Sequence, residues 1–269
     1  MEEKRKKVAL VLGGGGARGV MHIGALRVLK ENNIPIDMVV GTSMGSFIAG
    51  TYALYQDPDL IEKMVLQQLD SKTLLWFFDL TTHGGIAKGE RMEKWMDDWF
   101  KGKTFEELQI PLAVVAADIN SGQPVTLNSG YVASAIRAST AIPPAIKPFN
   151  YQAKMLIDGW VADPLPVGVA KEMGADIVIG VMMDSTEHKK YDEDNISIQE
   201  ALNRSFAIMS EQIIAHKKPF ADYIIKPKTG DVVIGGKLEE MAEKDKLMQH
   251  IKAGEVATID ALDDIKKLL

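Results

Sequence analysis

The 269-residue sequence contains no cysteine and no apolar stretch long enough to span a lipid bilayer. The lack of cysteine excludes disulfide bonds and thiolate metal sites. The net charge of -6 argues against broad nucleic-acid binding and against strong attraction to anionic lipid, so any membrane contact has to be local. The charged residues 1–7 lead into a strand rather than into a secretory apolar segment, so we expect a cytoplasmic protein.

The overall composition is that of one globular domain with a full core, at 46% hydrophobic and 25% charged residues. Strand and helix patterns alternate, and most of the strands are apolar throughout, as expected where helices cover both faces of a sheet. We therefore predict a three-layer α/β/α sandwich with a mostly parallel central sheet. The predicted strands are residues 8–12, 38–40, 112–116, 154–157 and 177–182.

Two glycine-containing turns each follow a short apolar strand and precede a helical pattern. In the second turn, Gly41, Ser43 and Gly45 have the spacing of a nucleophile elbow, a tight strand-to-helix turn that presents a serine hydroxyl. Glycine on either side leaves room for that strained turn. Ser43 is therefore the candidate nucleophile.

The first turn contains four consecutive glycines, residues 13–16, and opens a helix. Attack by a serine creates an oxyanion, which needs hydrogen-bond donors that are already in place. Glycine backbone N–H groups can turn outward without side-chain obstruction, and the positive end of a helix favours negative charge. We predict an oxyanion hole at Gly14, Gly15 and Gly16.

The same turn also matches the dinucleotide-binding pattern Gly14-x-Gly16-x-x-Gly19. That pattern needs an acidic residue at the end of the second strand to hold a ribose hydroxyl, whereas Asp37 stands at the beginning of that strand. A P-loop is excluded because no Gly-Lys-Ser/Thr follows the glycines. We expect neither a nucleotide cofactor nor a metal.

The base that takes the serine proton has two kinds of candidate. The histidines all stand in settings typical of packing or of a solvated helix surface; they are His22, His83, His188, His216 and His250. A partly desolvated carboxylate can replace histidine because burial raises its pKa toward neutrality. Asp158, which closes a short apolar strand before Gly159, is the best candidate, although the same local sequence also suits a turn aspartate that caps the next segment.

Taken together and in this order, the glycine loop, the serine elbow and the Asp158-Gly159 pair resemble the patatin-like phospholipases, specifically their compact bacterial members. The resemblance implies a patatin-like fold, a dyad of Ser43 and Asp158, and an oxyanion loop at residues 14–19. It covers residues 8–183, with weaker similarities at residues 135–143, 163–167 and 174–180. Arg18 matches a basic position of the family's loop, where it would brace the loop or meet an anionic head group.

One departure from the family pattern is Trp160, which stands where a small residue is usual. An indole beside the dyad would narrow the pocket or support an acyl chain, and the alternative is that it packs under the next loop. The resemblance implies a serine acyl hydrolase acting on phospholipid, lysophospholipid or another lipid ester. The alternative is a regulatory or scaffolding protein of the same fold with little catalysis.

Two further segments carry predictions. Residues 74–80 concentrate three aromatic side chains ahead of glycines at 84 and 85, which suits a lid or an interface, although aromatic clusters are more often core. After residue 183 we predict a loop over residues 184–195, an amphipathic helix at 198–216, a short strand at 223–226 and a C-terminal helix. We expect residues 184–269 to pack on the same domain, the alternative being that their apolar stripes form a dimer face.

Overall fold

The computed structural model describes residues 5–77, 79–81, 83–183, 196–229 and 243–269. Its sheet has the strand order β5-β6-β3-β2-β1-β7-β8, with β4 paired to β3. The bounds are β1 Val8–Leu12, β2 Met38–Thr42, β3 Leu112–Asp118, β4 Pro124–Leu127, β5 Phe149–Tyr151, β6 Lys154–Asp158, β7 Ile177–Val181 and β8 Tyr223–Ile225. The predicted strands are confirmed, while β4 and β5 were not predicted because they are short and largely half-buried or exposed.

The pairing divides the sheet into two parts. Strands β3, β2, β1, β7 and β8 run parallel to one another. Strands β4 and β6 pair antiparallel with β3, and β5 pairs antiparallel with β6. The sheet is therefore mixed and mostly parallel, and the strand that carries Asp158 runs against its neighbour.

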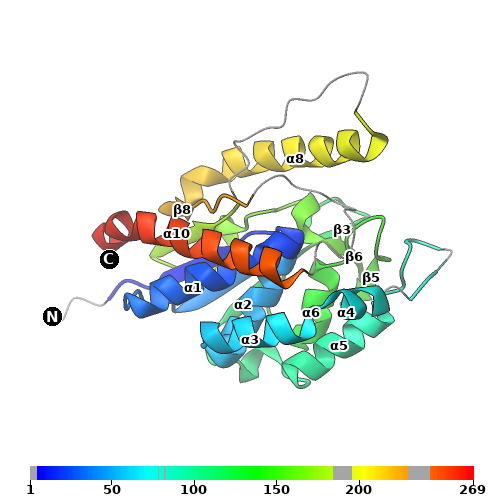
Figure 1. Cartoon of the computed structure of the whole chain (residues 1–269), viewed down its shortest axis with the longest axis horizontal. Coiled ribbons are helices and arrows are strands. Elements are labelled where there is room, and N and C mark those ends of the chain that lie inside the picture. Colours follow the sequence, from blue (N-terminus) through cyan, green and yellow to red (C-terminus); the bar gives the residue numbers. More distant parts are fainter. Residues whose placement is uncertain (1–4, 78, 82, 184–195, 230–242) are drawn as a thin grey trace.

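Helices cover both faces of the sheet, because side chains along each central strand alternate between two cores. One face bears most of the helices, and Figure 1 shows α8 on the opposite side of the sheet from α2, α3, α5 and α6. The helix bounds are α1 Met21–Glu31, α2 Met44–Tyr55, α3 Pro58–Gln68, α4 Ser71–Trp76, α5 Glu90–Phe100, α6 Val132–Ser139, α7 Val167–Glu172, α8 Ile198–Lys217 and α10 Lys244–Leu268. Short 3-10 helices are η1 Gly16–Val20, η2 Phe105–Glu107, η3 Gly159–Val161 and η4 Lys218–Phe220.

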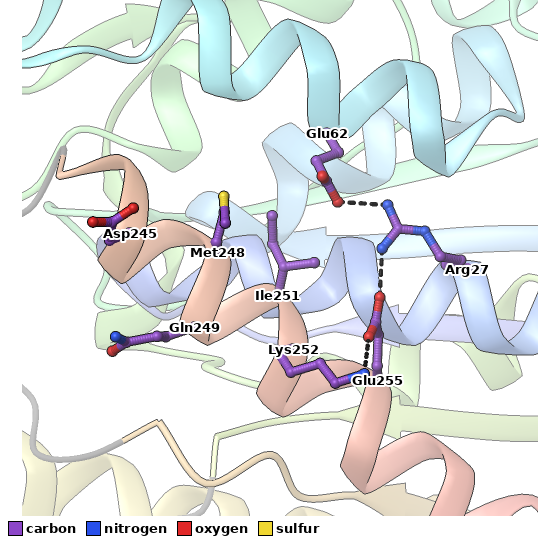
Figure 2. Close-up of a pocket in the computed structure, with 8 residues that line it drawn as sticks. All are labelled: Arg27, Glu62, Asp245, Met248, Gln249, Ile251, Lys252 and Glu255. Atoms are coloured by element: carbon purple, nitrogen blue, oxygen red, sulfur yellow. Dashed lines mark hydrogen bonds and ion pairs between the residues drawn. The ribbon is translucent and has the colours of Figure 1, made fainter.

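The C-terminal helix α10 lies against α1 and α3. Arg27 of α1 hydrogen-bonds Glu62 of α3 and Glu255 of α10, and Figure 2 shows its guanidinium between the two carboxylates. Lys252 adds a second ion pair to Glu255. The shallow pocket drawn there is lined by helix residues alone and contains no residue of the predicted dyad or glycine loop.

Both predicted C-terminal helices are present, and each exposes part of its predicted apolar stripe, while the predicted loop over residues 184–195 lies outside the described residues. In α10, Ile265 is buried while Ile259 is 54% exposed. In α8, Ile198 and Met209 are 84% and 55% exposed. Periodicity identifies an apolar face without identifying what covers it, so the packing of these stripes on the domain or against a second copy stays a prediction. Within the described ranges, no helix is long and apolar enough to cross a membrane.

Candidate active site

Ser43 occupies a strained turn between β2 and α2. Its backbone has φ 54° and ψ -129°, in the left-handed half of backbone space that non-glycine residues rarely adopt. A Cβ added to Gly45 would lie 2.1 Å from the carbonyl oxygen of Leu12, and one added to Gly41 would lie 2.4 Å from the Cα of Ser46. The predicted elbow therefore needs glycine on both sides because the backbones approach too closely for a side chain.

The turn is held from a neighbouring helix by Ser139, at the end of α6. The backbone N–H of Ser43 donates to Ser139 Oγ at 2.8 Å, and Ser139 Oγ donates to the carbonyl oxygen of Val115 at 2.6 Å. On the other side, Ser46 Oγ donates to the carbonyl oxygen of Ser43 at 2.6 Å. Ser139 lies in the stretch 135–143 that resembles the family, but a serine on a short helix has no local signature that predicts this role.

Asp158 meets Ser43 at the end of β6, in register with Ala116 of β3. Ser43 Oγ donates to Asp158 Oδ2 at 2.7 Å, and the backbone N–H of Trp160 donates to Asp158 Oδ1 at 2.8 Å. Each of the two interpretations of Asp158 corresponds to one of its carboxylate oxygens. Oδ1 caps the next turn, while Oδ2 accepts the hydrogen bond from Ser43.

The environment of Asp158 favours its protonated form. Its side chain is buried, and burial raises the pKa of Asp158 to about 7, against the lowering effect of the hydrogen bonds from Ser43 and Trp160. A carboxyl group with a pKa near neutrality populates both forms around pH 7, so it can accept a proton and return it.

The glycine loop lies next to the dyad, and its amides are not all equivalent. Gly13 N–H donates to the carbonyl oxygen of Val181, and Gly14 N–H donates to that of Pro164 at 3.1 Å. Among the residues that the structure describes, the amides of Gly15 and Gly16 have no acceptor. Of the three predicted oxyanion donors, Gly14 is thus already committed within the fold.

A buried histidine fixes the base of the same loop. His22 Nε2 lies 2.7 Å from the carbonyl oxygen of Gly13, and burial lowers the pKa of His22 to about 4 despite that hydrogen bond. The ring is therefore neutral at pH 7 and donates through Nε2. This agrees with the expected packing and hydrogen-bonding role.

The other histidines make no hydrogen bond to the dyad where the structure describes them. His216 is exposed on α8, where its Nδ1 contacts the carbonyl oxygen of Gln212, and His188 lies outside the described residues. The dyad's own hydrogen bonds include no histidine. In the part of the chain that is described, no three His, Cys, Asp or Glu residues are grouped to hold a metal ion.

Trp160 lies against the glycine loop beside the nucleophile. A Cβ added to Gly14 would be 2.4 Å from Trp160 Cε3 and 3.4 Å from Ser43 Cβ, so the indole lies against the loop beside the serine. The indole Nε1 is buried and has no partner in the described part of the chain. Ser43 itself is only 4% exposed. The indole is also partly buried against the smaller of the two cores of the sheet, which supports the packing interpretation, and a narrowed entrance to the dyad stays a prediction.

Two supporting positions complete the site. Gly159 follows Asp158 where a Cβ would lie 2.1 Å from the carbonyl oxygen of Val115. Arg18 is 9% exposed and lies near His250 of α10, whose pKa is lowered by burial and by the charge of Arg18. Such burial suits a side chain that braces the loop better than one that contacts a head group in solvent.

Comparison with known protein families matches residues 10–171, more than half of the chain, to the family described as patatin-like phospholipase. The chain belongs to that family. An uncharacterized NTE family protein of Mycobacterium bovis is 34% identical over 182 residues, which cover 67% of this chain and 50% of the relative. The lysophospholipase nte1 of Neurospora crassa is 34% identical over 185 residues, covering 68% of this chain and 12% of the fungal protein.

The solved structure of VipD from Legionella pneumophila has the same fold, with a TM-score of 0.64 at 16% identity. The likeness covers 97% of this chain and 67% of VipD. The chain spans about half the length of its mycobacterial relatives and a small part of the fungal ones. The family and the patatin-like fold are thereby confirmed, and the activity remains a proposal.

Proposed function

We propose that the protein is a serine acyl hydrolase of lipid esters, of phospholipase A or lysophospholipase type, with Ser43 as nucleophile and Asp158 as base. The observation that carries the proposal is the 2.7 Å hydrogen bond from Ser43 Oγ to Asp158 Oδ2 inside a buried site. The family match and the lysophospholipases among the relatives support a lipid ester as the substrate class.

In the first half of the reaction, Ser43 Oγ bonds to the ester carbonyl carbon while its proton passes to Asp158. The amides of Gly15 and Gly16 are the donors that we assign to the oxyanion. Asp158 then gives the proton to the leaving alcohol as the ester bond breaks. In the second half, Asp158 takes a proton from water, whose oxygen attacks the acyl-enzyme, and returns it to Ser43 as the fatty acid leaves.

A second candidate is a regulatory or scaffolding protein with little catalysis. The observations that favour it are the position of Trp160 against Gly14 beside Ser43 and the 4% exposure of the nucleophile. Substrate would have to displace the indole or enter beside it. The two candidates differ in whether the wild type turns over any ester.

Hydrolysis of a short-chain p-nitrophenyl ester and of lysophosphatidylcholine separates the candidates. We expect Ser43→Ala and Asp158→Asn each to lower kcat/KM by a factor of about 100 to 10,000, the usual worth of nucleophile activation. The matched control is Ser210→Ala. Ser210 is also 4% exposed, but its hydroxyl donates to the carbonyl oxygen of Phe206 within α8. A folded wild type that is no faster than Ser43→Ala on either substrate would favour the scaffolding role.

A further inference from the structure

The end of α4 and the connection from α4 to α5 expose four large apolar side chains. Leu75 is 53% exposed, Trp76 43%, Leu80 74% and Ile86 51%. Figure 1 shows this connection projecting from one end of the molecule. We call these four residues the apolar patch. Four such exposed groups within twelve residues exceed the scattered apolar residues of an ordinary surface and indicate a binding face.

The patch is presented by backbone that is bonded to the body of the protein. The carboxylate of Asp79 accepts N–H groups from Gly89 and Glu90 at 2.7 and 3.0 Å, which caps the start of α5. Ile86 N–H donates to the carbonyl oxygen of Pro144 at 3.0 Å. The exposure of the patch is therefore a feature of the fold.

The patch also belongs to the same packed unit as the nucleophile. Ring contacts run from Trp76 to Phe77 at 6.2 Å, from Phe77 to Trp95 at 5.2 Å, and from Trp95 to Phe47 at 5.6 Å. Phe47 lies in the first turn of α2, and that helix begins directly after Ser43. An object bound at the patch is thus held in a fixed relation to the elbow.

The α6 helix makes a second link between the patch and the site. Arg137 donates from Nη2 to the carbonyl oxygen of Lys88 at 2.8 Å and from Nε to that of Gly89 at 3.0 Å. Ser139, two residues further along α6, holds the backbone of Ser43. The helix α6 therefore contacts both the connection that carries Leu80 and Ile86 and the turn that holds Ser43.

Basic side chains surround the patch although the whole chain is acidic. The guanidinium carbon of Arg91 lies 5.7 Å from the centre of the Trp76 ring. Exposed lysines stand at residues 72, 88 and 147, the last beside the glycines of the connection. Asp70 and Glu90 are exposed acids of the same region, while Asp79 is occupied by backbone N–H groups, so the exposed cations outnumber the exposed acids there. Aromatic and aliphatic groups bordered by cations match the apolar and anionic layers of a lipid surface.

We propose that the protein binds, through the apolar patch, to a bilayer that contains anionic phospholipid. Trp76 and Leu80 enter the interface, and Arg91 with the three lysines faces the head groups. The inference deepens the proposed function, because it supplies the surface from which a lipid ester would reach Ser43. A second copy of the chain fits less well, because a two-fold contact would bring the same basic border against itself.

The test is sedimentation with phosphatidylcholine vesicles, with and without phosphatidylglycerol, carried out in a Ser43→Ala background so that binding is measured without turnover. We expect binding to the phosphatidylglycerol vesicles that weakens as salt is raised. Adding Leu80→Asp should lower the affinity about tenfold or more, since a buried leucine contributes that much. The matched control is Ile259→Asp, because Ile259 is 54% exposed on α10, and it should bind as before.

Three results would overturn the inference. They are no vesicle binding by the folded protein, loss of binding with Met209→Asp on α8 but not with Leu80→Asp, and a dimer that Leu80→Asp dissociates in place of any vesicle binding. Failure of the proposed function is distinguishable, because hydrolysis of a water-soluble ester does not need the patch. Leu80→Asp should therefore keep the wild-type rate on the p-nitrophenyl ester while losing activity on vesicles.

Discussion

Replacing Asp158 with asparagine should make the protein more stable above pH 7 while removing its activity. Asp158 is buried, and its pKa rises from 3.8 to about 7 in the folded protein. Asparagine has nearly the same shape and can still accept a hydrogen bond from Ser43 or from the Trp160 amide. The substitution therefore removes a buried charge with little change in packing.

The magnitude follows from the two pKa values. Each pKa unit corresponds to about 1.4 kcal/mol, so ionising Asp158 costs the folded protein about 4 kcal/mol. Between about pH 4 and pH 7 the folded protein binds this proton more tightly than the unfolded chain does, so the wild type loses stability as pH rises through that window. The advantage of Asp158→Asn should then grow by roughly 2 to 3 kcal/mol from pH 5 to pH 8.

Urea unfolding of both proteins at pH 5 and pH 8 measures that growth directly. Ser43→Ala serves as the reference, because it is also inactive but keeps the ionisable group. Losing the Ser43 hydrogen bond raises the pKa of Asp158 further, so the stability of Ser43→Ala should fall from pH 5 to pH 8 at least as much as that of the wild type. A stability difference between Asp158→Asn and the wild type that stays constant from pH 5 to pH 8 would refute the raised pKa. It would also remove the physical basis for Asp158 as the base.

Three further predictions concern the same region. Ester hydrolysis should increase with pH and level off above about pH 7, because the carboxylate form of Asp158 takes the Ser43 proton, and a pH–rate profile that is flat from pH 5 to pH 8 would contradict this. Trp160→Ala should raise kcat/KM for long-chain esters about tenfold over that for short ones, and an unchanged ratio would mean that the indole does not restrict entry. Gly45→Ala should lower the free energy of unfolding by about 3 kcal/mol because its Cβ would meet the Leu12 carbonyl, whereas Gly168→Ala, with open space around it in α7, should be neutral or slightly stabilising in the same urea titration.

The parts of the fold that could be predicted are those that a short stretch of sequence determines. An apolar run followed by glycines predicts β1 and its loop, and the spacing of Gly41, Ser43 and Gly45 predicts the elbow after β2. Adjacent parallel strands then bring both turns to one edge of the sheet. For this reason the nucleophile and the loop could be placed together from their own residues.

Asp158 and Ser139 depend on contacts that local sequence does not encode. Asp158 lies 115 residues from Ser43 in the chain, and it reaches the serine only because β6 pairs antiparallel with β3. The family resemblance indicated Asp158, whereas Ser139 lay in a weaker similarity, residues 135–143, that gave it no role. Among the predicted oxyanion donors, only tertiary structure could reveal that Gly14 donates to Pro164.

The aromatic segment shows the same limit. Its composition favoured the core over a lid or an interface, and the structure divides it, with Phe77 buried and Trp76 exposed. Phe78 lies outside the described residues. Whether the segment moves as a lid therefore stays a prediction, while its exposed side chains supply the patch.

The most direct test of the dyad is covalent trapping of the wild type, Ser43→Ala and Asp158→Asn with a lipid-like fluorophosphonate, followed by intact-mass measurement and peptide mapping. The dyad predicts a single adduct on Ser43 of the wild type, no adduct on Ser43→Ala, and labelling of Asp158→Asn that is slower by about 100-fold or more. An adduct on another residue, or no adduct on folded wild type in the presence of lipid or detergent, would contradict the central claim that Ser43 is a nucleophile activated by Asp158.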